Sequence, residues 1–595
     1  MVLVILAKHG AVVQIMHMRS LPKTSRVAAP LLVLFALGCE ASDGGGPPNS
    51  NTGGKGGGVG GSINVGGGVE LPPGTEAKSL LPARIRRLAD AEYQASVSAL
   101  VPGAAAAISA DFIPDSRQSG FTLNEAQRVD PVFAGQLAAA ASKLAADVRA
   151  HAAERAPCAN PATEADACAD KFIRQFGEEA YRRPLGADEV THLMAVFHMG
   201  LEGGSYEEGI ELVVRAMLQS AAFLYLTEIG AAPGATVKLT AYELASSISF
   251  LVQGRPPSKA LVQLAVDGKL DTEQGRLDMV SDPNVNLFGA DGSDFNAQTR
   301  AVKVFKEWLG TDKISEVAKD TNIYSDFAGV KGALEQETTQ FLSTAVTSGV
   351  AGGGSLTELL GGTWSMVNAP LAKVYGVSAP GATDSTFVRV DLPNRRGILN
   401  QGAFLSVFAH AHETAPVLRG VAIMRRIACI PVASPVDLKM AVVPPLPDPS
   451  KTTRERFTTH ATTLCSGCHN SIDNFGFAFE GFDGMGKERT MDNGAVVDSS
   501  VVVSGTDFDG SYADSNALAT ALSTSAQVRQ CFARHIYRAL ATTSAPELAA
   551  SEDDFVKYWD LGLPKDGSGK VLDANLVGTI TAFLTNPSFA FRRAQ

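Results

Sequence analysis

The chain has 595 residues, of which 45% are hydrophobic and 19% charged, so a wholly disordered protein is excluded and several folded domains are expected. Its formal net charge is −11 and no long stretch is strongly basic, which argues against sequence-independent binding of nucleic acid. No uninterrupted apolar run reaches the ~20 residues that a membrane-spanning helix needs, so a multi-span membrane protein is excluded as well.

Residues 1–38 have the layout of a secretory signal peptide. The apolar run Val27–Leu37 follows a basic stretch, and this order is typical of an export signal. The run ends in Gly38-Cys39, which resembles the bacterial lipoprotein signal, where the Cys is lipidated and becomes the mature N-terminus. We therefore expect lipidation of Cys39. The alternative is an ordinary signal peptide that is cut near this point and still exports the protein.

Residues 39–81 contain a segment dominated by Gly, Ser, Asn and Pro, which cannot bury apolar area and behaves as a flexible tether. A lipid anchor followed by a tether would hold the folded part near a membrane without embedding it. The expected location is the cell envelope, either on the periplasmic side or at the outer-membrane surface, with the membrane as one partner.

The folded part begins near Pro82 and is dominated by the helical period. Apolar residues recur at three and four positions in Phe133–His151 and Gly209–Glu228. Strand signals are short and confined to places such as Thr386–Leu392 and Ala495–Ser504. These patterns predict a mainly α, multidomain helical protein with a small amount of β structure.

Pro- and Gly-rich breaks suggest boundaries between the domains. We expect a first helical domain at 82–150, a second at 151–230, a third at 231–380, a domain with a Cys-x-x-Cys-His motif at 381–500, and a C-terminal helical domain at 501–595.

The seven cysteines can be divided by their spacing. Cys158 and Cys168 lie ten residues apart in a polar segment that contains Pro, and an oxidising compartment would favour a local disulfide between them. Cys429 and Cys531 then remain as a second pair by elimination. For both pairs the alternative is a buried free thiol, since Cys is among the most buried residue types.

Cys465, Cys468 and His469 form a Cys-x-x-Cys-His sequence, the attachment signal of c-type haem. Two thiols three residues apart can each add to one haem vinyl group, and the next imidazole then reaches the iron as the proximal ligand. The motif predicts covalent haem c, with its iron, in a cytochrome c-like attachment region. A thioredoxin-like redox pair would need a βαβ pattern, and a zinc site would need a second ligand pair; neither surrounds the motif.

The sixth iron ligand stays open between three residues. Met485 and Met491 lie 16 and 22 residues after His469, and a Met ligand would raise the reduction potential into the electron-transfer range. His460, nine residues before His469, could instead bind iron or orient the site. Each Met alone is more often core filling than ligand.

Motifs at five places support a family resemblance. They are Arg86-Arg87-Leu88, Phe172–Leu185 (FIRQFGEEAYRRPL), Leu239–Leu251 (LTAYELASSISFL), Thr414–Gly420 (TAPVLRG), and the run from Cys465 through Asp473 and Glu480 to Asp483. The chain thereby resembles the planctomycete-type cytochrome-c-associated multidomain proteins, a series of domains of unknown function also common in myxobacteria. The resemblance covers most of residues 82–595. It implies an exported, cytochrome-like redox role and names no substrate.

Two functions from different classes follow. The first is an exported, membrane-tethered c-type haem protein that exchanges electrons with a redox partner protein or acts as a haem-dependent oxidoreductase. The second is a surface scaffold or binding lipoprotein in which Cys465–Cys468 is a structural disulfide and His469 is incidental.

Overall fold

A computed structural model describes residues 71–594 except 73–74, 104–107, 109–111, 233, 290–292, 346–353, 434–444, 447, 461–465, 543–548, 564, 566, 568–570 and 572, with the side chains of 459–460 also left out. The protein is 56% helical and its strands are short, so the predicted mainly α class is confirmed. Within the described ranges, no helix is long and apolar enough to cross a membrane.

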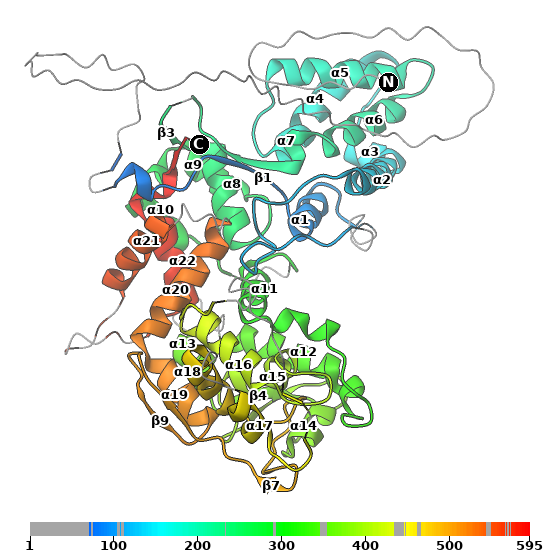
Figure 1. The fold of residues 1–595 in the computed structure, drawn as a ribbon. Helices are drawn as coiled ribbons and strands as arrows, with labels where there is room; N and C mark the ends of the chain where they lie inside the picture. Colours follow the sequence, from blue (N-terminus) through cyan, green and yellow to red (C-terminus); the bar gives the residue numbers. More distant parts are fainter. Residues whose placement is uncertain are drawn as a thin grey trace, which may run out of the picture.

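The first seven helices form one end of the molecule (Figure 1). They are α1 (Asp90–Leu100), α2 (Pro131–Ala150), α3 (Ala152–Arg155), α4 (Pro161–Tyr181), α5 (Ala187–Leu201), α6 (Tyr206–Leu218) and α7 (Ala221–Leu224). Their apolar faces share one core, which runs from Leu88 to Leu226 and also includes Phe250. The expected first and second helical segments therefore pack around a common interior. Cys158 and Cys168 form a disulfide at the start of α4, as their spacing predicts.

The middle of the chain builds the next helices. They are α8 (Ala241–Val252), α9 (Lys259–Val266), α10 (Glu273–Val280), α11 (Ala297–Leu309), α12 (Phe327–Ala345), α13 (Leu356–Gly361) and α14 (Ala369–Tyr375). Helix α8 shows why such segments start where they do. Thr240 accepts a hydrogen bond from the backbone N–H of Glu243, and the Glu243 carboxylate accepts one from the N–H of Thr240, so the first turn is capped from both sides.

The remaining helices occupy the other end and one side of the molecule (Figure 1). They are α15 (Gly402–Val407), α16 (Pro416–Ala422), α17 (Thr453–His460), α18 (Ser466–Phe477), α19 (Ser515–Thr524), α20 (Ala526–Ala541), α21 (Ala549–Gly562) and α22 (Leu576–Thr585). Short 3₁₀ turns occur at η1 (Ala77–Ser79), η4 (Lys269–Asp271), η5 (Thr311–Glu316), η6 (Ile398–Asn400) and η9 (Pro587–Ala590), and η7 (Ile423–Ile427) is a π-helical turn. Cys429, just after η7, is joined to Cys531 of α20 by the second disulfide.

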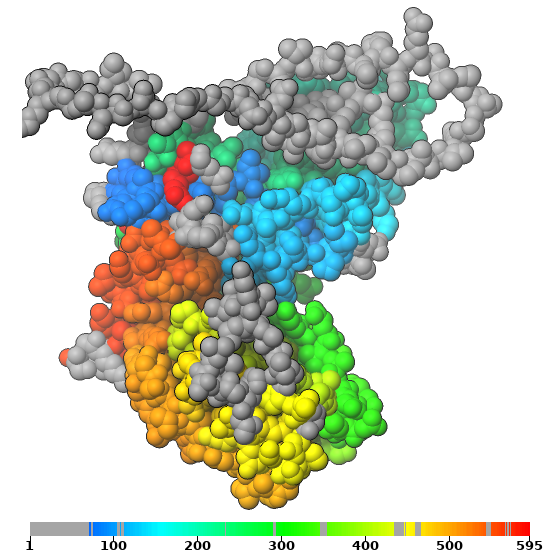
Figure 2. All heavy atoms as spheres, in the orientation of Figure 1, coloured from blue at the N-terminus to red at the C-terminus, as the bar shows by residue number. Residues whose placement is uncertain are grey.

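The strands form antiparallel pairs. They are β1 (Arg84–Arg87) with β2 (Tyr225–Glu228), β3 (Thr236–Lys238) with β10 (Phe591–Arg593), β4 (Trp364–Val367) with β5 (Val388–Asp391), β6 (Met491–Asp492) with β7 (Ala495–Val496), and β8 (Val501–Val503) with β9 (Gly510–Tyr512). The strand signals at Thr386–Leu392 and Ala495–Ser504 are thus confirmed. In Figure 2 the orange and red C-terminal segments lie beside the blue segment that carries β1. The N–H of Ala83 donates to the carbonyl of Arg593 at that contact.

The expected helix at Gly209–Glu228 is wrong in its second half. Helix α6 ends at Leu218, and Ser220 caps the single turn α7. Tyr225–Glu228 is instead the strand β2, paired in register with Arg84–Arg87. A partner strand about 140 residues earlier in the chain overrides the local helical period.

Buried ion pairs join elements that are distant in sequence. Glu228 of β2 accepts from Nε of Arg84 at 3.0 Å and from Nε of Arg592 at 2.7 Å. Glu92 of α1 accepts from Nη2 of Arg86 and from Nη2 of Arg300, each at 2.9 Å. The first cluster ties β1 and β2 to the last strand, and the second ties α1 to α11.

We predict that Glu92→Gln lowers the free energy of unfolding by about 3–5 kcal/mol, because it leaves two buried guanidinium groups without their carboxylate. Burial raises the pKa of Glu92, but Arg86 and Arg300 outweigh it and bring the value down to about 2. A depressed pKa gives stability that is present above the unfolded value near 4.5 and is lost as pH falls toward 2. Urea unfolding at several pH values measures both effects.

The control is Asp170→Asn, which removes an exposed carboxylate paired with Arg174 on one helix face. It should leave the urea midpoint nearly unchanged. A wild type and a Glu92→Gln variant of equal stability at neutral pH would contradict the assigned role.

Candidate functional site

The Cys-x-x-Cys-His motif lies at the start of α18. Cys468 and His469 are in the first turn of this helix, and Cys468 is a free, exposed thiol. Cys465 lies outside the described residues, as does Cys39. Among the described residues, a Cβ placed on Gly467 would meet nothing within 4 Å.

The imidazole of His469 is oriented by an acidic residue one turn further along the same helix. Its Nδ1 lies 3.0 Å from Oδ1 of Asp473, whose side chain is only 8% exposed. A carboxylate only accepts hydrogen bonds, so in the neutral ring this contact places the proton on Nδ1 and makes Nε2 the acceptor nitrogen. That tautomer is the one in which a metal-binding histidine uses Nε2.

Two glycines set the position of α18 against α16. A Cβ on Gly420 would lie 2.0 Å from the carbonyl oxygen of Ile472, and a Cβ on Gly476 would lie 1.9 Å from that of Pro416. The two helix backbones therefore touch at both points. Because the earlier residue of α16 faces the later residue of α18, the helices run antiparallel, and η7 extends toward the N-terminal turn of α18.

Arg419 organises the chain that follows α18. Its guanidinium is fully buried and donates to the carbonyl oxygens of Phe479, Phe482 and Asp483, and to that of Leu405. Burial lowers the pKa of Arg419 to about 10, so it remains a cation at neutral pH.

Glu480 is the acidic partner of this region. Its carboxylate lies 3.7 Å from Arg419 and accepts from Nη2 of Arg489 at 2.7 Å and from Oγ1 of Thr414 at 2.9 Å. Asp483 accepts from the backbone N–H groups of Met485 and Lys487 and so closes a turn. Both acidic residues thus shape the backbone.

The structure places the candidates for a sixth ligand in different surroundings. Met485 is 5% exposed and packs in an apolar cluster with Leu334 and Tyr375, whereas Ile472 and Phe475 of α18 belong to another cluster. Met491 is half exposed on β6. His460 ends α17, and its side chain lies outside the described part of the chain. The choice between these residues stays a prediction.

The residues at the start of α18 fit the donor set of a c-type haem. An exposed thiol and an imidazole with its Nδ1 hydrogen-bonded are together at one helix end. Sequence reasoning found Cys468 and His469 but missed the role of Asp473. The spacing of four residues on a helix was the signal that could have found it.

Fold and site together define a class of mainly helical, multidomain proteins with a Cys-x-x-Cys-His motif. Cys468 and His469 of this motif lie on a helix, and the buried Arg419 binds the segment that follows this helix. Four family models match the chain. They are PSD3, protein of unknown function (DUF1587), at 86–150; PSD5, protein of unknown function (DUF1595), at 168–228; PSD4, protein of unknown function (DUF1592), at 239–377; and PSCyt3, protein of unknown function (DUF1588), at 395–492. No curated protein and no solved structure matches the chain.

The chain belongs to the planctomycete-type cytochrome-c-associated multidomain series, as its motifs suggest. The PSCyt3 match contains the Cys-x-x-Cys-His motif together with Arg419, Asp473 and Glu480. The domains of this series have no assigned activity, so membership alone names neither a substrate nor a partner.

We predict that Gly476→Ala lowers the free energy of unfolding by about 1–3 kcal/mol, because the new methyl group would overlap the backbone of α16. Gly467→Ala on the same helix is the matched control. Its Cβ meets open space, so it should be neutral or stabilise by up to about 1 kcal/mol through helix propensity. Urea unfolding of the two variants checks the difference, and equal stabilities would show that α16 and α18 do not pack as closely as described.

Proposed function

We propose that the protein is an exported c-type haem protein, tethered to a membrane through lipidated Cys39, that exchanges electrons with a redox partner. The observation that supports this proposal is that an exposed cysteine thiol lies beside an oriented histidine in the motif. Four other cysteines are paired in two disulfides, whereas Cys468 is a free, exposed thiol beside a histidine whose Nδ1 is held by Asp473. Membership in a cytochrome-associated series gives further support.

In this proposal Cys465 and Cys468 anchor the haem through thioether bonds, and His469 is the proximal ligand. The bound haem would supply a one-electron change between ferric and ferrous iron. The residues of the chain would fix the imidazole, with Asp473 as a positioning residue that accepts the Nδ1 proton. The exposure of Cys468 would leave one haem edge near the surface, where a redox partner can approach.

The scaffold alternative needs Cys465 and Cys468 to form a structural disulfide. The contact of His469 Nδ1 with the carboxylate of Asp473 supports haem attachment over that alternative, because a structural disulfide needs no oriented imidazole beside it. The scaffold remains the second candidate because the domains of the series are of unknown function.

We predict that the exported protein, produced with a functioning haem-attachment system, keeps haem after denaturing electrophoresis, since thioether bonds survive denaturation. Replacing Cys465 and Cys468 by Ala should abolish haem staining. Replacing Cys158 and Cys168 by Ser removes the same number of cysteines at a disulfide distant in sequence from the motif, and should leave staining intact. Wild-type protein without covalent haem would exclude the cytochrome and favour the scaffold.

We predict that Asp473→Asn raises the reduction potential of the attached haem by an amount on the order of tens of millivolts, because a carboxylate that accepts the Nδ1 proton makes the imidazole a stronger donor and stabilises ferric iron. Covalent haem should be retained. A spectroelectrochemical titration measures the potential, and Asp473→Glu, which keeps a carboxylate, should give a potential between those of the wild type and Asp473→Asn.

The control removes a charge elsewhere in the same region. Asp498→Asn takes away a carboxylate that accepts hydrogen bonds from Ser500 and pairs with Arg454. If both Asn variants shift the potential equally, the effect is general electrostatics and Asp473 does not act through His469.

A further inference from the structure

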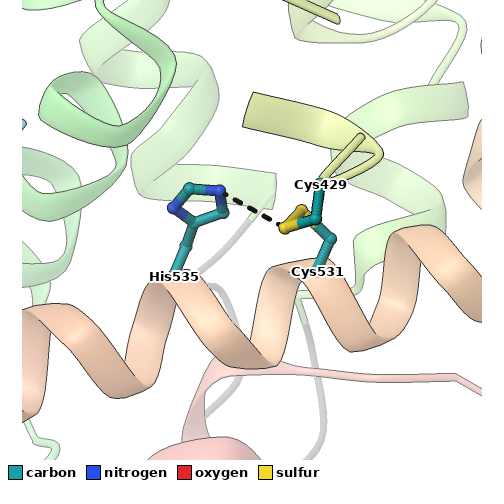
Figure 3. Close-up of side chains that lie close together, drawn as sticks. All are labelled: Cys429, Cys531 and His535. Atoms are coloured by element: carbon teal, nitrogen blue, oxygen red, sulfur yellow. Dashed lines mark hydrogen bonds between the residues drawn. A yellow bond between two sulfur atoms is a disulfide. The ribbon is translucent and has the colours of Figure 1, made fainter. Parts of the chain in front are cut away.

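The second disulfide has a histidine beside it (Figure 3). Cys531 and His535 lie four residues apart on α20 and so share one face of the helix, while Cys429 approaches from the end of η7. The Sγ atom of Cys429 lies 3.8 Å from Nε2 of His535. The two sulfur atoms and a ring nitrogen of His535 all lie within 4.8 Å of one another.

The imidazole of His535 is partly buried among apolar and cationic groups. The centroids of the Trp308 and His535 rings lie 5.5 Å apart. The imidazole of His535 also makes a hydrogen bond with the backbone of Arg425. Burial, with Arg538 and Arg426 nearby, lowers the pKa of His535 to about 3. The ring is therefore neutral at physiological pH, which is the form that binds metals.

We propose that Cys429, Cys531 and His535 form a redox-gated site for a zinc-like divalent cation. In the oxidised protein the two cysteines are a disulfide. A dithiol reductant delivers two electrons and two protons to the S–S bond, giving two thiols, and is itself oxidised to a disulfide. The cation then binds both sulfurs as thiolates, with release of two protons, and binds Nε2 of His535 as its third ligand.

The positions of the three groups suit tetrahedral coordination. With Zn–S near 2.3 Å and Zn–N near 2.0–2.1 Å, the sulfur and nitrogen ligands of one zinc ion lie about 3.6 Å apart. The observed separation of Cys429 Sγ and His535 Nε2 is 3.8 Å. The two sulfurs must separate to about 3.8 Å once the bond between them is reduced, and the sulfur of Cys531 lies within 4.8 Å of the imidazole nitrogen.

The net charge of the proposed site and the exposure of Cys429 also agree with a bound divalent cation. A divalent cation with two thiolates is neutral, so it can lie in a buried place where an unpaired cation could not. Cys531 is buried, but Cys429 is only partly so, which leaves one side for a fourth ligand such as water. The other disulfide offers a weaker set, because its third group is the exposed carboxylate of Glu164. The proposal is independent of the haem.

The test uses the full mature chain with only two cysteines left, so that no other thiol can bind the probe. The replaced residues are Cys39, Cys158, Cys168, Cys465 and Cys468, each changed to Ser. The chain is reduced with dithiothreitol, freed of it under argon, and titrated with Co²⁺. We expect one equivalent of Co²⁺ to give a thiolate-to-cobalt charge-transfer band that Zn²⁺ abolishes, and the oxidised chain to give none.

His535→Ala should weaken Co²⁺ binding at least tenfold, and His535→Gln tests the same ligand with less loss of packing. A matched chain that keeps Cys158 and Cys168 but has Ser at 429 and 531 should show no stoichiometric band. Zn²⁺ should also raise the thermal midpoint of the reduced two-cysteine chain, and not that of the His535 variants.

Three results would overturn the proposal. The first is a reduced chain with two titratable thiols and no cobalt band, and the second is binding that His535→Ala leaves unchanged. The third is a reduced chain that unfolds and is not refolded by either cation, which would make the pair a purely structural disulfide.

Discussion

The position of the motif helix depends on one buried cation. Arg419 of α16 has no exposed surface, and its guanidinium holds the carbonyl groups of Phe479, Phe482 and Asp483 in the segment after α18. Because Glu480 is the carboxylate that offsets this charge, a change in the path of that segment would leave a buried ion without its partners. The path is thus fixed at the C-terminal end of α18, while the glycine contacts fix the helix against α16.

Buried arginine–carboxylate contacts also occur where distant parts of the chain meet. Glu228 is shared by Arg84 and Arg592, and Glu92 is shared by Arg86 and Arg300. Each cluster has two guanidinium groups for one carboxylate, so the remaining donors rely on backbone carbonyls such as those of Phe589 and Phe250. These contacts need one arrangement of the elements, and that arrangement connects the first strand, the helical middle and the last strand.

The sequence predicted features that depend on neighbouring residues, and it missed contacts between residues that are distant in the chain. The helix over Phe133–His151 and the strand within Thr386–Leu392 follow from periodicity and occur as expected. The helix expected through Glu228 fails because β2 pairs with a strand near residue 85. The motif residues at the site were found from spacing, and the two disulfides from cysteine arithmetic. The contact of Gly476 with Pro416, and the carbonyls around Arg419, depend on tertiary packing that no local pattern encodes.

The antiparallel packing of α16 and α18 joins the two cysteine sites. From the contact of Gly420 with Ile472, α16 continues into the π-helical turn η7, which contacts α18, and η7 leads to Cys429. Cys429 is bonded to α20, so the disulfide anchors the turn that contacts α18. π-Helical turns are frequent at functional sites. Opening the disulfide would remove the covalent link between α20 and the turn that contacts α18.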